Sequence, residues 1–434
     1  MSQGNAVNII FAATKFSRPA HHPFLLDRHE QTWCANSKHK LNATIRNCLH
    51  QIIHYILLST MTEEDSCYSS VGSDDPMDDD WLSRSLKEQI GEKKLDGNWS
   101  AIDSATDNGS PTPFTIVTWN VWFSLHEWQV RLEALLVESL QHDPDVLCFQ
   151  EITTNVHSIM LQCDYLCELY HPTEERLRHG YDCTIWIKKD RFKLFSTTTI
   201  PLDSIYGRRG LLADLEMITG GKSSTQTKPN LRIRVVTTHL ESGKGMGSTR
   251  IMQLKTLFPS IQSVPWLYGE RTPSNHAPAQ ASSHTNVDAA FLVGDFNLDP
   301  NNNSEENSLV DSNGIDLWKL LRKEEHGYTE NTYQNRMRYL AHGPKHKQVR
   351  YDRIIMINNE KTIGGTDAVP RTPVAAKIDG ATDSTACKNV PQCIKLLGTL
   401  PFDKAQSIWP SDHFGLVATV GIEISNENQS SGKL

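Results

Sequence analysis

The sequence predicts an α/β or α+β sandwich, in which sheets and helices form packed layers. Between residues 113 and 422, apolar runs rich in β-branched and aromatic residues alternate with segments that repeat apolar residues at helical spacing. The hydrophobic content of 38% and the charged content of 22% are typical of a globular protein with polar loops. No run reaches the roughly 20 apolar residues needed to span a bilayer, and we therefore expect no membrane contact.

The individual elements follow from their residues. Phe114–Trp119 is a β-branched and aromatic run, which predicts a strand. Residues 128–140 repeat Val and Leu at helical spacing, and a break at 143–145 then leads into an apolar strand at 146–149. The same alternation predicts further strands at 182–188, 211–217, 231–238, 289–294, 352–357 and 414–422, and further helices at 154–161, 248–262 and 315–324. Polar loops are expected at 219–230, 268–287, 299–313 and 359–393.

Two stretches precede the predicted domain. Residues 1–60 carry many basic and few acidic side chains, which fits either a mitochondrial transit peptide or a stretch ahead of a true translation start at Met61. Residues 62–112 are rich in Asp, Ser and Gly, and their like charges favour disorder, with one short helix at 81–90. We therefore expect residues 1–112 to be a disordered extension and residues 424–434 a disordered tail, on either side of a folded domain at 113–423.

Charge and cysteine content narrow the class of protein. The formal net charge is −8 and the sequence pI is about 6.1, whereas a protein that slides along DNA needs a broadly basic face. An enzyme that holds one DNA end in a local basic groove is compatible with this charge. The 9 cysteines include no CxxC pair, so we expect reduced thiols rather than a disulfide framework or a zinc site. The lack of a signal peptide and of a membrane span points to the cytosol or nucleus.

Four short blocks each place a polar or acidic residue next to an apolar strand. They are Thr118-Trp119-Asn120, Phe149-Gln150-Glu151, Gly294-Asp295-Phe296-Asn297 and Ser411-Asp412-His413. Catalytic groups gather at strand ends because the sheet holds them rigidly while the loops admit substrate. One such residue alone is more often a cap or turn residue, but four blocks in this order favour a shared site.

The four blocks resemble the TWN, QE, GDxN and SDH motifs of the endonuclease/exonuclease/phosphatase superfamily. Two further segments, His239-Leu240-Glu241-Ser242 and Arg350-Tyr351-Asp352-Arg353-Ile354, are similar to the tyrosyl-DNA phosphodiesterase 2 subfamily. The resemblance covers about residues 113–422. It implies a four-layer sandwich of two packed mixed β-sheets flanked by helices, with the active site at one edge where the strand-end loops converge.

The resemblance implies a hydrolase that cleaves phosphodiester bonds, with Mg²⁺ or Mn²⁺ as cofactor. A phosphodiester repels an attacking hydroxide, and a hard divalent ion neutralises that charge while preferring carboxylate oxygen and water as ligands. Glu151 is the metal ligand that best fits this chemistry. Asn120 can hold the phosphate or a metal-bound water without adding charge.

The remaining motif residues receive roles from the same resemblance. Asp295 would activate the attacking water, and Asn297 would help to orient it. His413 would donate to a phosphoryl oxygen in the transition state, and Asp352 would orient His413 and support its imidazolium. The alternative for His413 is a core histidine, which its position beside Asp412 disfavours.

Five residues are expected to contact the substrate. His239 and Ser242 match a family segment that contacts the 5′ phosphate end; alternatively, His239 ends a strand and Ser242 caps a helix. Tyr181 and Tyr351 match aromatic positions that contact nucleotides, where stacking tolerates any base; both could instead pack against the sheet. Arg209 matches a basic residue that meets the DNA backbone, with a solvated arginine as the alternative.

Three positions depart from the family pattern. Trp122 stands where family members often carry Asp, which removes an accessory carboxylate from the metal site. Asp299 stands where the subfamily has Arg, and Glu330 stands where it has Trp. Both of these changes weaken the expected attraction to DNA and leave the catalytic residues unchanged.

We therefore expect a repair enzyme that hydrolyses the bond between a tyrosine and a 5′ DNA phosphate, freeing DNA ends that topoisomerase II has trapped. Its partners would be DNA 5′ ends with tyrosyl or peptide adducts, and it would act as a monomer in the nucleus and cytoplasm. One alternative keeps the fold and changes the substrate to RNA 3′ ends, abasic sites, or lipid and inositol phosphates. Another is an inactive scaffold that binds nucleic acid or protein, which the complete motifs disfavour.

Overall fold

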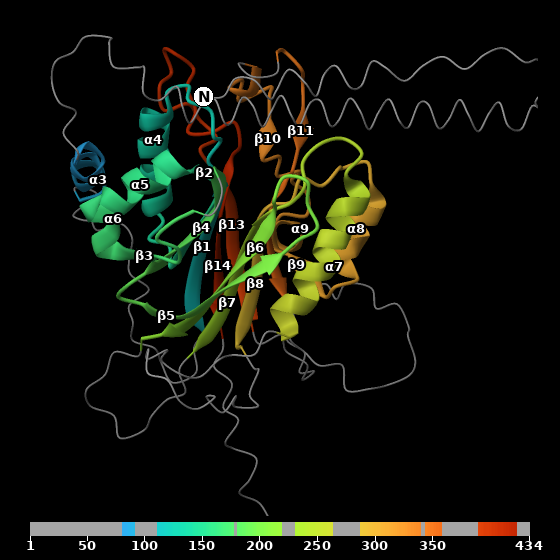
Figure 1. The fold of residues 1–434 in the computed structure, drawn as a ribbon. Helices are drawn as coiled ribbons and strands as arrows, with labels where there is room; N and C mark the ends of the chain where they lie inside the picture. The colour runs from blue at the N-terminus through green and yellow to red at the C-terminus, as the bar shows by residue number, and fades with distance from the viewer. Residues whose placement is uncertain are drawn as a thin grey trace, which may run out of the picture. The chain divides into compact units, whose positions relative to one another are not determined.

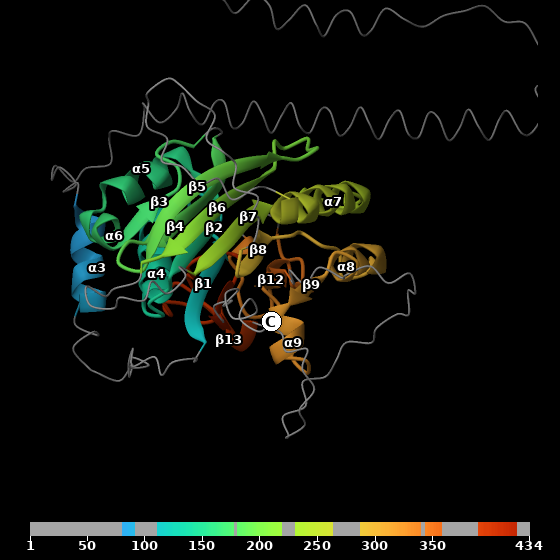
Figure 2. The same ribbon diagram turned by 90° about the horizontal axis from the view of Figure 1, so that it is seen from below.

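Two six-stranded β-sheets pack against each other, and helices cover the outer face of each (Figure 1). The computed structural model describes residues 80–91, 111–177, 180–218, 231–263, 287–339, 343–357 and 389–422. All of them belong to one compact unit, Pro76–Leu434. The helices that follow the first strands and those that follow the middle strands lie on opposite sides of the two sheets in both views (Figure 2).

The first sheet has the strand order β13-β14-β1-β2-β4-β3. It is mixed, because β1 runs parallel to β2 and antiparallel to β14. Its strands are β1 (Thr112–Asn120), β2 (Val146–Thr153), β3 (Tyr170–Pro172), β4 (Tyr181–Lys188), β13 (Asn389–Leu397) and β14 (Gly415–Ile422). The helices packed on its outer face are α3 (Trp81–Gly91), α4 (Trp128–Leu140), α5 (Thr154–Gln162) and α6 (Asp164–Leu169).

The second sheet has the strand order β5-β6-β7-β8-β12-β9 and is also mixed, with β7 parallel to β8. Its strands are β5 (Phe192–Pro201), β6 (Arg209–Met217), β7 (Arg232–His239), β8 (Ala289–Asp295), β9 (Gly314–Asp316) and β12 (Asp352–Ile357). Its outer face carries α7 (Gly247–Ser263) and α8 (Asn303–Val310). The remaining elements are α9 (Leu317–Leu321) and the short pair β10 (Glu330–Asn331) and β11 (Gln348–Val349).

The main core lies between the two sheets. Phe114 of β1 and Phe291 of β8 stack with ring centroids 5.4 Å apart, and both are fully buried. Because side chains alternate along a strand, the neighbours of these residues point outward and meet the helices instead. Leu147 of β2 does so beneath α4, and Leu292 of β8 does so beneath α7. The resulting layers are helix, sheet, sheet and helix, which confirms the predicted four-layer sandwich.

Most predicted elements are confirmed, and the differences have identifiable causes. The helix expected at 315–324 is only α9, because residues 314–316 pair with β12 as an edge strand. Part of the loop expected at 299–313 is α8, a short polar helix whose N-terminus Asn302 caps. The loop expected at 359–393 ends in β13, an edge strand in which only Ile394 and Leu397 are buried, so that it lacks a buried apolar run. Residues 219–230 and 268–286 lie outside the described residues.

Helix α3 lies within the stretch 1–112 that we expected to be disordered. Its Leu82, Leu86 and Ile90 side chains are buried in the cluster that α4 and α6 form on the first sheet. The helix at 81–90 is thus confirmed, but the expectation of disorder is wrong there, because an apolar face with helical spacing finds a partner. Most of the rest of 1–112, and the tail at 424–434, lie outside the described residues.

Two compositional expectations can be compared with the structure. Within the described ranges, none of the helices has the length and apolar character that a bilayer span requires. The five cysteines in those ranges, Cys148, Cys163, Cys167, Cys183 and Cys393, are free thiols. This agrees with the expected lack of a disulfide framework for this part of the chain.

Candidate active site

Three neighbouring strands of the second sheet end in polar side chains that lie side by side. In the strand register, Asp295 at the end of β8 is opposite His239 of β7 and Asp352 of β12. Gly294 makes this approach possible. Its φ is +129°, and an added Cβ would lie 2.0 Å from the Thr238 carbonyl oxygen. Only glycine fits there, which gives the first residue of the GDxN block a physical reason.

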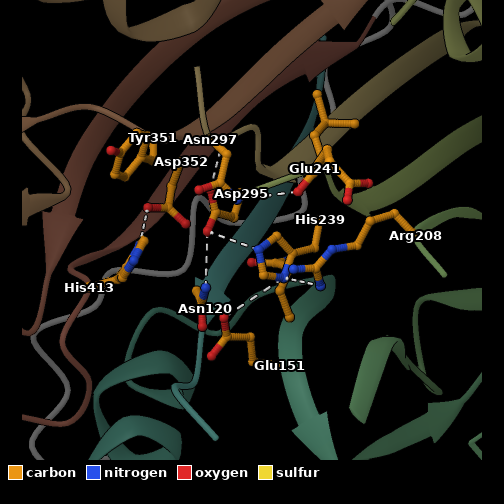
Figure 3. A network of polar contacts seen from close by, with 12 residues as sticks. Asn120, Glu151, Arg208, His239, Glu241, Asp295, Asn297, Tyr351, Asp352 and His413 are labelled. Carbon is orange, nitrogen blue, oxygen red and sulfur yellow. Dashed lines mark hydrogen bonds and ion pairs between the residues drawn. The ribbon is translucent and has the colours of Figure 1, made fainter. Parts of the chain in front are cut away.

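The first sheet contributes Asn120 and Glu151 from the ends of β1 and β2. Asn120 donates from Nδ2 to Asp295 Oδ2 at 3.0 Å and so joins the two sheets (Figure 3). Glu151 has a φ of +58° and lies where the pairing of β2 with β4 shifts register. Such an irregularity re-aims a side chain, at a backbone cost of about 1 kcal/mol or more. Here the Glu151 carboxylate comes to lie close to His239, with 3.9 Å between Oε1 and Nδ1.

Asp295 is the centre of this arrangement (Figure 3). Its Oδ1 accepts from the Asn297 backbone N–H at 2.9 Å, and its Oδ2 lies 3.4 Å from His239 Nε2. Burial would raise the pKa of Asp295, but the Nε2–H of His239, the charged His413 and the hydrogen bonds from Asn120 and Asn297 outweigh it and lower the pKa below its ordinary value. Asp295 is therefore a buried carboxylate that stays ionised and fixed in orientation.

His413 forms a buried pair with Asp352. Its Nδ1 lies 2.8 Å from Asp352 Oδ2, and the Tyr351 ring stacks beside it with centroids 6.1 Å apart. Burial by itself lowers the pKa of His413, but Asp352, followed by Asp412 and Asp295, raises it well above the ordinary value. His413 is therefore an imidazolium that presents its other N–H away from Asp352.

The protonation of His239 follows from its neighbours. Arg208 Nη1 lies 3.0 Å from His239 Nδ1, and a guanidinium can only donate, so Nδ1 is the acceptor. Burial and the adjacent Arg208 lower the pKa of His239 to about 3, which keeps the ring neutral. The proton therefore sits on Nε2 and faces Asp295.

Comparison with known proteins shows the family. The model of the Endonuclease/Exonuclease/phosphatase family matches residues 117–413, more than half of the chain. The chain belongs to this family. It is accordingly a hydrolase of phosphodiester bonds, in agreement with the ordered motifs and with the site geometry.

Individual members of the family differ in how far they match. Tyrosyl-DNA phosphodiesterase 2 from Homo sapiens is 26% identical over 322 residues, which cover 74% of this chain and 71% of the human one. Nocturnin from Xenopus laevis is 23% identical over 231 residues, covering 48% and 53% of the two chains. The structure of D. rerio TDP2 with a single-stranded DNA product has a TM-score of 0.50, with 20% identity, and covers 71% of this chain and 99% of that one. This last likeness shows the fold.

Other substrate residues of the family pattern lie as follows. Tyr181 is half-buried and stacks on Phe123 at 5.3 Å, and the Arg208 guanidinium lies 5.4 Å from its ring centre. Ser242 lies in the loop after β7, five positions before α7 begins at Gly247, so the alternative that it caps this helix is wrong. Asn297 donates from Nδ2 to the Leu240 carbonyl at 3.2 Å, which ties the GDxN loop to the loop that carries Ser242.

Arg209 has a different environment from the one expected. It is 5% exposed and pairs with Glu174 at 2.6 Å and Asp182 at 2.7 Å, so its charge is already neutralised below the surface. The alternative of a solvated side chain is wrong, whereas the expected contact with a DNA backbone stays a prediction. The neighbouring residue, Arg208, is the arginine that contacts His239 at the site. The two arginines are adjacent in the sequence, so the position of the loop before β6 decides which one faces the site.

Two of the three residues that depart from the family pattern, Glu330 and Asp299, make structural contacts. Glu330 is fully buried and pairs with Arg338 at 2.8 Å and Lys347 at 2.9 Å, so it does not present the anion that we expected to repel DNA. Asp299 accepts from the Asn301 backbone N–H at 3.0 Å and so shapes a turn.

The third departure, Trp122, is part of an apolar cluster beside the site. Its side chain is buried in a cluster with Met337, Ile408, Trp409 and Phe414. Asp412, which the motif assigned no separate role, supplies negative charge in this region. Together with burial, Asp412 raises the pKa of Glu151 to about 7.

The donor set fits a hard divalent cation. Asp295, Asp352 and His413 place ligand atoms within 4.8 Å of one another, but Asp352 and His413 are already committed to each other. Glu151 has no ion-pair partner closer than His239 at 3.9 Å among the described residues. Glu151 is a partly buried carboxylate near Asp412 that has no close cation on the described residues. Mg²⁺ prefers oxygen ligands, and its charge would compensate these two carboxylates. The Asn120 Oδ1 atom accepts a hydrogen bond from the Trp122 N–H at 3.0 Å, and its second lone pair is left for a cation or a water molecule.

Arg131 is a buried cation that sequence reasoning missed. It is 2% exposed, and it takes part in none of the ion pairs found among the described residues. Its guanidinium instead donates to backbone carbonyls on both sides of the site. The acceptors are those of Val121, Trp122, Ser124, His126 and Pro410.

Replacing Arg131 by methionine is therefore expected to destabilise the fold and to loosen the site. Five carbonyl groups lose a donor, and each buried group left unpaired costs about 1 kcal/mol or more. We expect the free energy of unfolding to fall by about 5 kcal/mol and kcat to fall even at temperatures where the variant is folded. Urea unfolding and initial rates measure the two effects. Arg131→Lys should recover part of the stability and part of the activity. Unchanged stability in Arg131→Met would refute the stabilising role of these hydrogen bonds.

Proposed function

We propose that the protein is a Mg²⁺- or Mn²⁺-dependent phosphodiesterase that hydrolyses the bond between a tyrosine and the 5′ phosphate of DNA. The observation that carries this proposal is the convergence of an ionised Asp295, a protonated His413 and a Glu151 whose nearest ion-pair partner is the neutral His239 at 3.9 Å, at the ends of strands from both sheets. This set provides a base, a donor to developing charge and a metal ligand at one place. The similarity to human tyrosyl-DNA phosphodiesterase 2 supports the choice of substrate.

In this mechanism the chain's own residues supply proton transfer and positioning. Asp295 accepts a proton from the attacking water, while Asn120 and the Asn297 N–H hold its carboxylate in place. His413, oriented by Asp352, donates to a phosphoryl oxygen as negative charge develops there. A divalent cation bound by Glu151, with help from Asn120, would neutralise charge on the phosphate.

The aromatic leaving group is favoured by the surroundings of Arg208. The guanidinium lies over the rings of Tyr181 and Tyr206 at 5.4 and 5.6 Å and reaches His239. A cation against aromatic faces can accommodate a further phenol ring and stabilise the phenolate that leaves. The proposed partners are DNA 5′ ends with tyrosyl or peptide adducts of topoisomerase II. The proposal includes a monomeric enzyme that acts in the nucleus and cytoplasm.

A substrate panel tests this proposal. The purified chain should release tyrosine from a 5′-tyrosyl oligonucleotide with Mg²⁺ or Mn²⁺ and should lose this activity in EDTA. RNA 3′ ends, abasic DNA and inositol phosphates are the comparison substrates. Cleavage of another phosphodiester at the same site is the alternative outcome of this panel. If a comparison substrate is cleaved and the tyrosyl oligonucleotide is left intact, the proposed substrate is rejected, while the family membership stands.

Arg208→Ala is expected to discriminate between leaving groups. We expect kcat on the tyrosyl oligonucleotide to fall by about 100-fold, the scale on which loss of one charge-stabilising donor acts. A 5′-(4-nitrophenyl) ester should lose much less, because nitrophenolate needs little stabilisation. Arg84→Ala, on the exposed face of α3, is the matched control and should leave both rates unchanged. Equal losses on the two esters would show that Arg208 binds only the phosphate.

A further inference from the structure

A basic pocket lies beside α9, outside the residues assigned to the candidate active site. Its volume is about 290 Å³. Five basic side chains and one acidic side chain line it, together with Trp318. The basic residues are Lys319, Arg322, Lys323, His326 and Arg350, and the acid is Glu325. We call it the α9 pocket.

The cations of the α9 pocket differ in how far they are neutralised. Lys319 pairs with Glu306 at 2.5 Å, and Arg322 pairs with Glu325 at 2.9 Å. Lys323 has no anionic partner among the described residues. His326 is exposed and stacks on Tyr328, with ring centroids 4.9 Å apart. The pocket therefore keeps an excess of positive charge after its internal ion pairs are counted.

Arg350 is the buried member of this set, at 9% exposed. It donates from Nη1 to Asp316 Oδ1 at 2.8 Å, and Arg353 binds the other oxygen of the same carboxylate at 2.7 Å. One carboxylate thus serves two guanidinium groups, and the remaining N–H groups of Arg350 have no partner in the described part of the chain. A buried guanidinium with spare donors that lines a basic pocket favours an anion with several oxygen acceptors.

Two chain segments that line the α9 pocket continue into the candidate active site. Tyr351 follows Arg350 and stacks on His413. On the other wall, Tyr328 stacks on His326 and precedes Thr329, whose hydroxyl accepts from the backbone N–H of Tyr351 at 3.0 Å. Two short segments therefore connect the pocket with the residues around the catalytic histidine.

We propose that the α9 pocket is a phosphate-binding subsite, with Arg350, Lys323 and His326 as its donors. The phosphate belongs either to a nucleic-acid strand that extends from the active site or to a small phosphate-bearing molecule. A phosphate matches the fork of Arg350 and the excess charge better than a carboxylate, because it offers more acceptor oxygens. The strand source rests on the proposed function, whereas the phosphate chemistry of the pocket does not.

The first test measures strand binding without turnover. The full chain in EDTA is titrated with a fluorescent single-stranded oligonucleotide at several salt concentrations. The variant is Lys323→Ala/His326→Ala, which leaves the Arg350–Asp316 pair intact. Loss of one phosphate contact should weaken binding about 5-fold at 0.1 M salt and reduce the slope of log K against log salt by about 0.7. Lys87→Ala, on the exposed face of α3, is the matched control and should change neither quantity.

The second test uses inorganic phosphate and follows the His326 imidazole by NMR. Saturable shifts in the native protein, with Lys323→Ala weakening the titration, support the small-molecule source. Weaker binding by the pocket variants in either titration supports the proposal. If the pocket variants bind both ligands as the Lys87→Ala control does, the proposal is overturned. Failure of the tyrosyl substrate panel with pocket binding intact would reject the proposed function alone, because both titrations are measured without hydrolysis.

Discussion

Asp295→Asn is expected to lower kcat on any phosphodiester substrate by about 10³-fold, the scale of a lost general base. Asparagine keeps the size of the side chain and can still contact Asn120 and the Asn297 N–H. It cannot accept a proton from water, and it removes the negative charge that faces His239 at 3.4 Å. The measurement is single-turnover hydrolysis at saturating enzyme, which separates the chemical step from binding.

The control for Asp295→Asn is Asp190→Asn, an exposed aspartate at the turn between β4 and β5. It should behave like the native chain. Thermal unfolding of both variants tests whether a rate loss reflects misfolding. A folded Asp295→Asn protein with native kcat would exclude Asp295 as the base and leave the site without an ionised acceptor for the proton of water.

Glu151→Gln is expected to reduce activity by roughly 10²- to 10³-fold at a fixed Mg²⁺ concentration, because a divalent ion contributes several kcal/mol to charge stabilisation. The loss should be smaller at high Mg²⁺, since the variant weakens a ligand and leaves Asp295 and His413 in place. Metal titration of initial rates separates these effects. An apparent Mg²⁺ affinity equal to that of the native chain would place the metal elsewhere.

Glu151→Gln should not destabilise the metal-free fold. Burial and Asp412 already raise the pKa of Glu151 to about 7, so the folded chain disfavours the ionised carboxylate as the pH rises above its ordinary pKa of 4.5. Removing this group should therefore leave stability in EDTA at pH 8 unchanged or increase it. Glu88→Gln, on the exposed face of α3, is the neutral reference in the same measurement.

The strand ends of the site could be predicted because their pattern is local. Asn120, Glu151, Asp295 and His413 each adjoin a run of buried residues, and the structure brings all four together. The strands themselves were predictable for the same reason, since a buried run shows its period directly. Edge strands such as β13 escape this reasoning, because half of their side chains face solvent.

Residues whose roles depend on a distant partner could not be predicted. Val130 has an apolar side chain but is 40% exposed, whereas Arg131 beside it is buried by carbonyl groups from two separate loops. In the sequence, Glu330 resembles an exposed acidic residue, but in the structure it is buried and pairs with Arg338 and Lys347. In each case a paired or hydrogen-bonded charge is stable inside the protein, and composition alone does not show where the pairing group will lie.

The measurement that tests the central claim most directly is anomalous diffraction from crystals soaked in Mn²⁺. The account predicts one strong peak bonded to a Glu151 carboxylate oxygen, on the side of Asn120 and Asp295. A peak held between Asp352 and His413 would contradict it, as would an empty Glu151 in crystals whose dissolved protein hydrolyses the substrate with Mn²⁺.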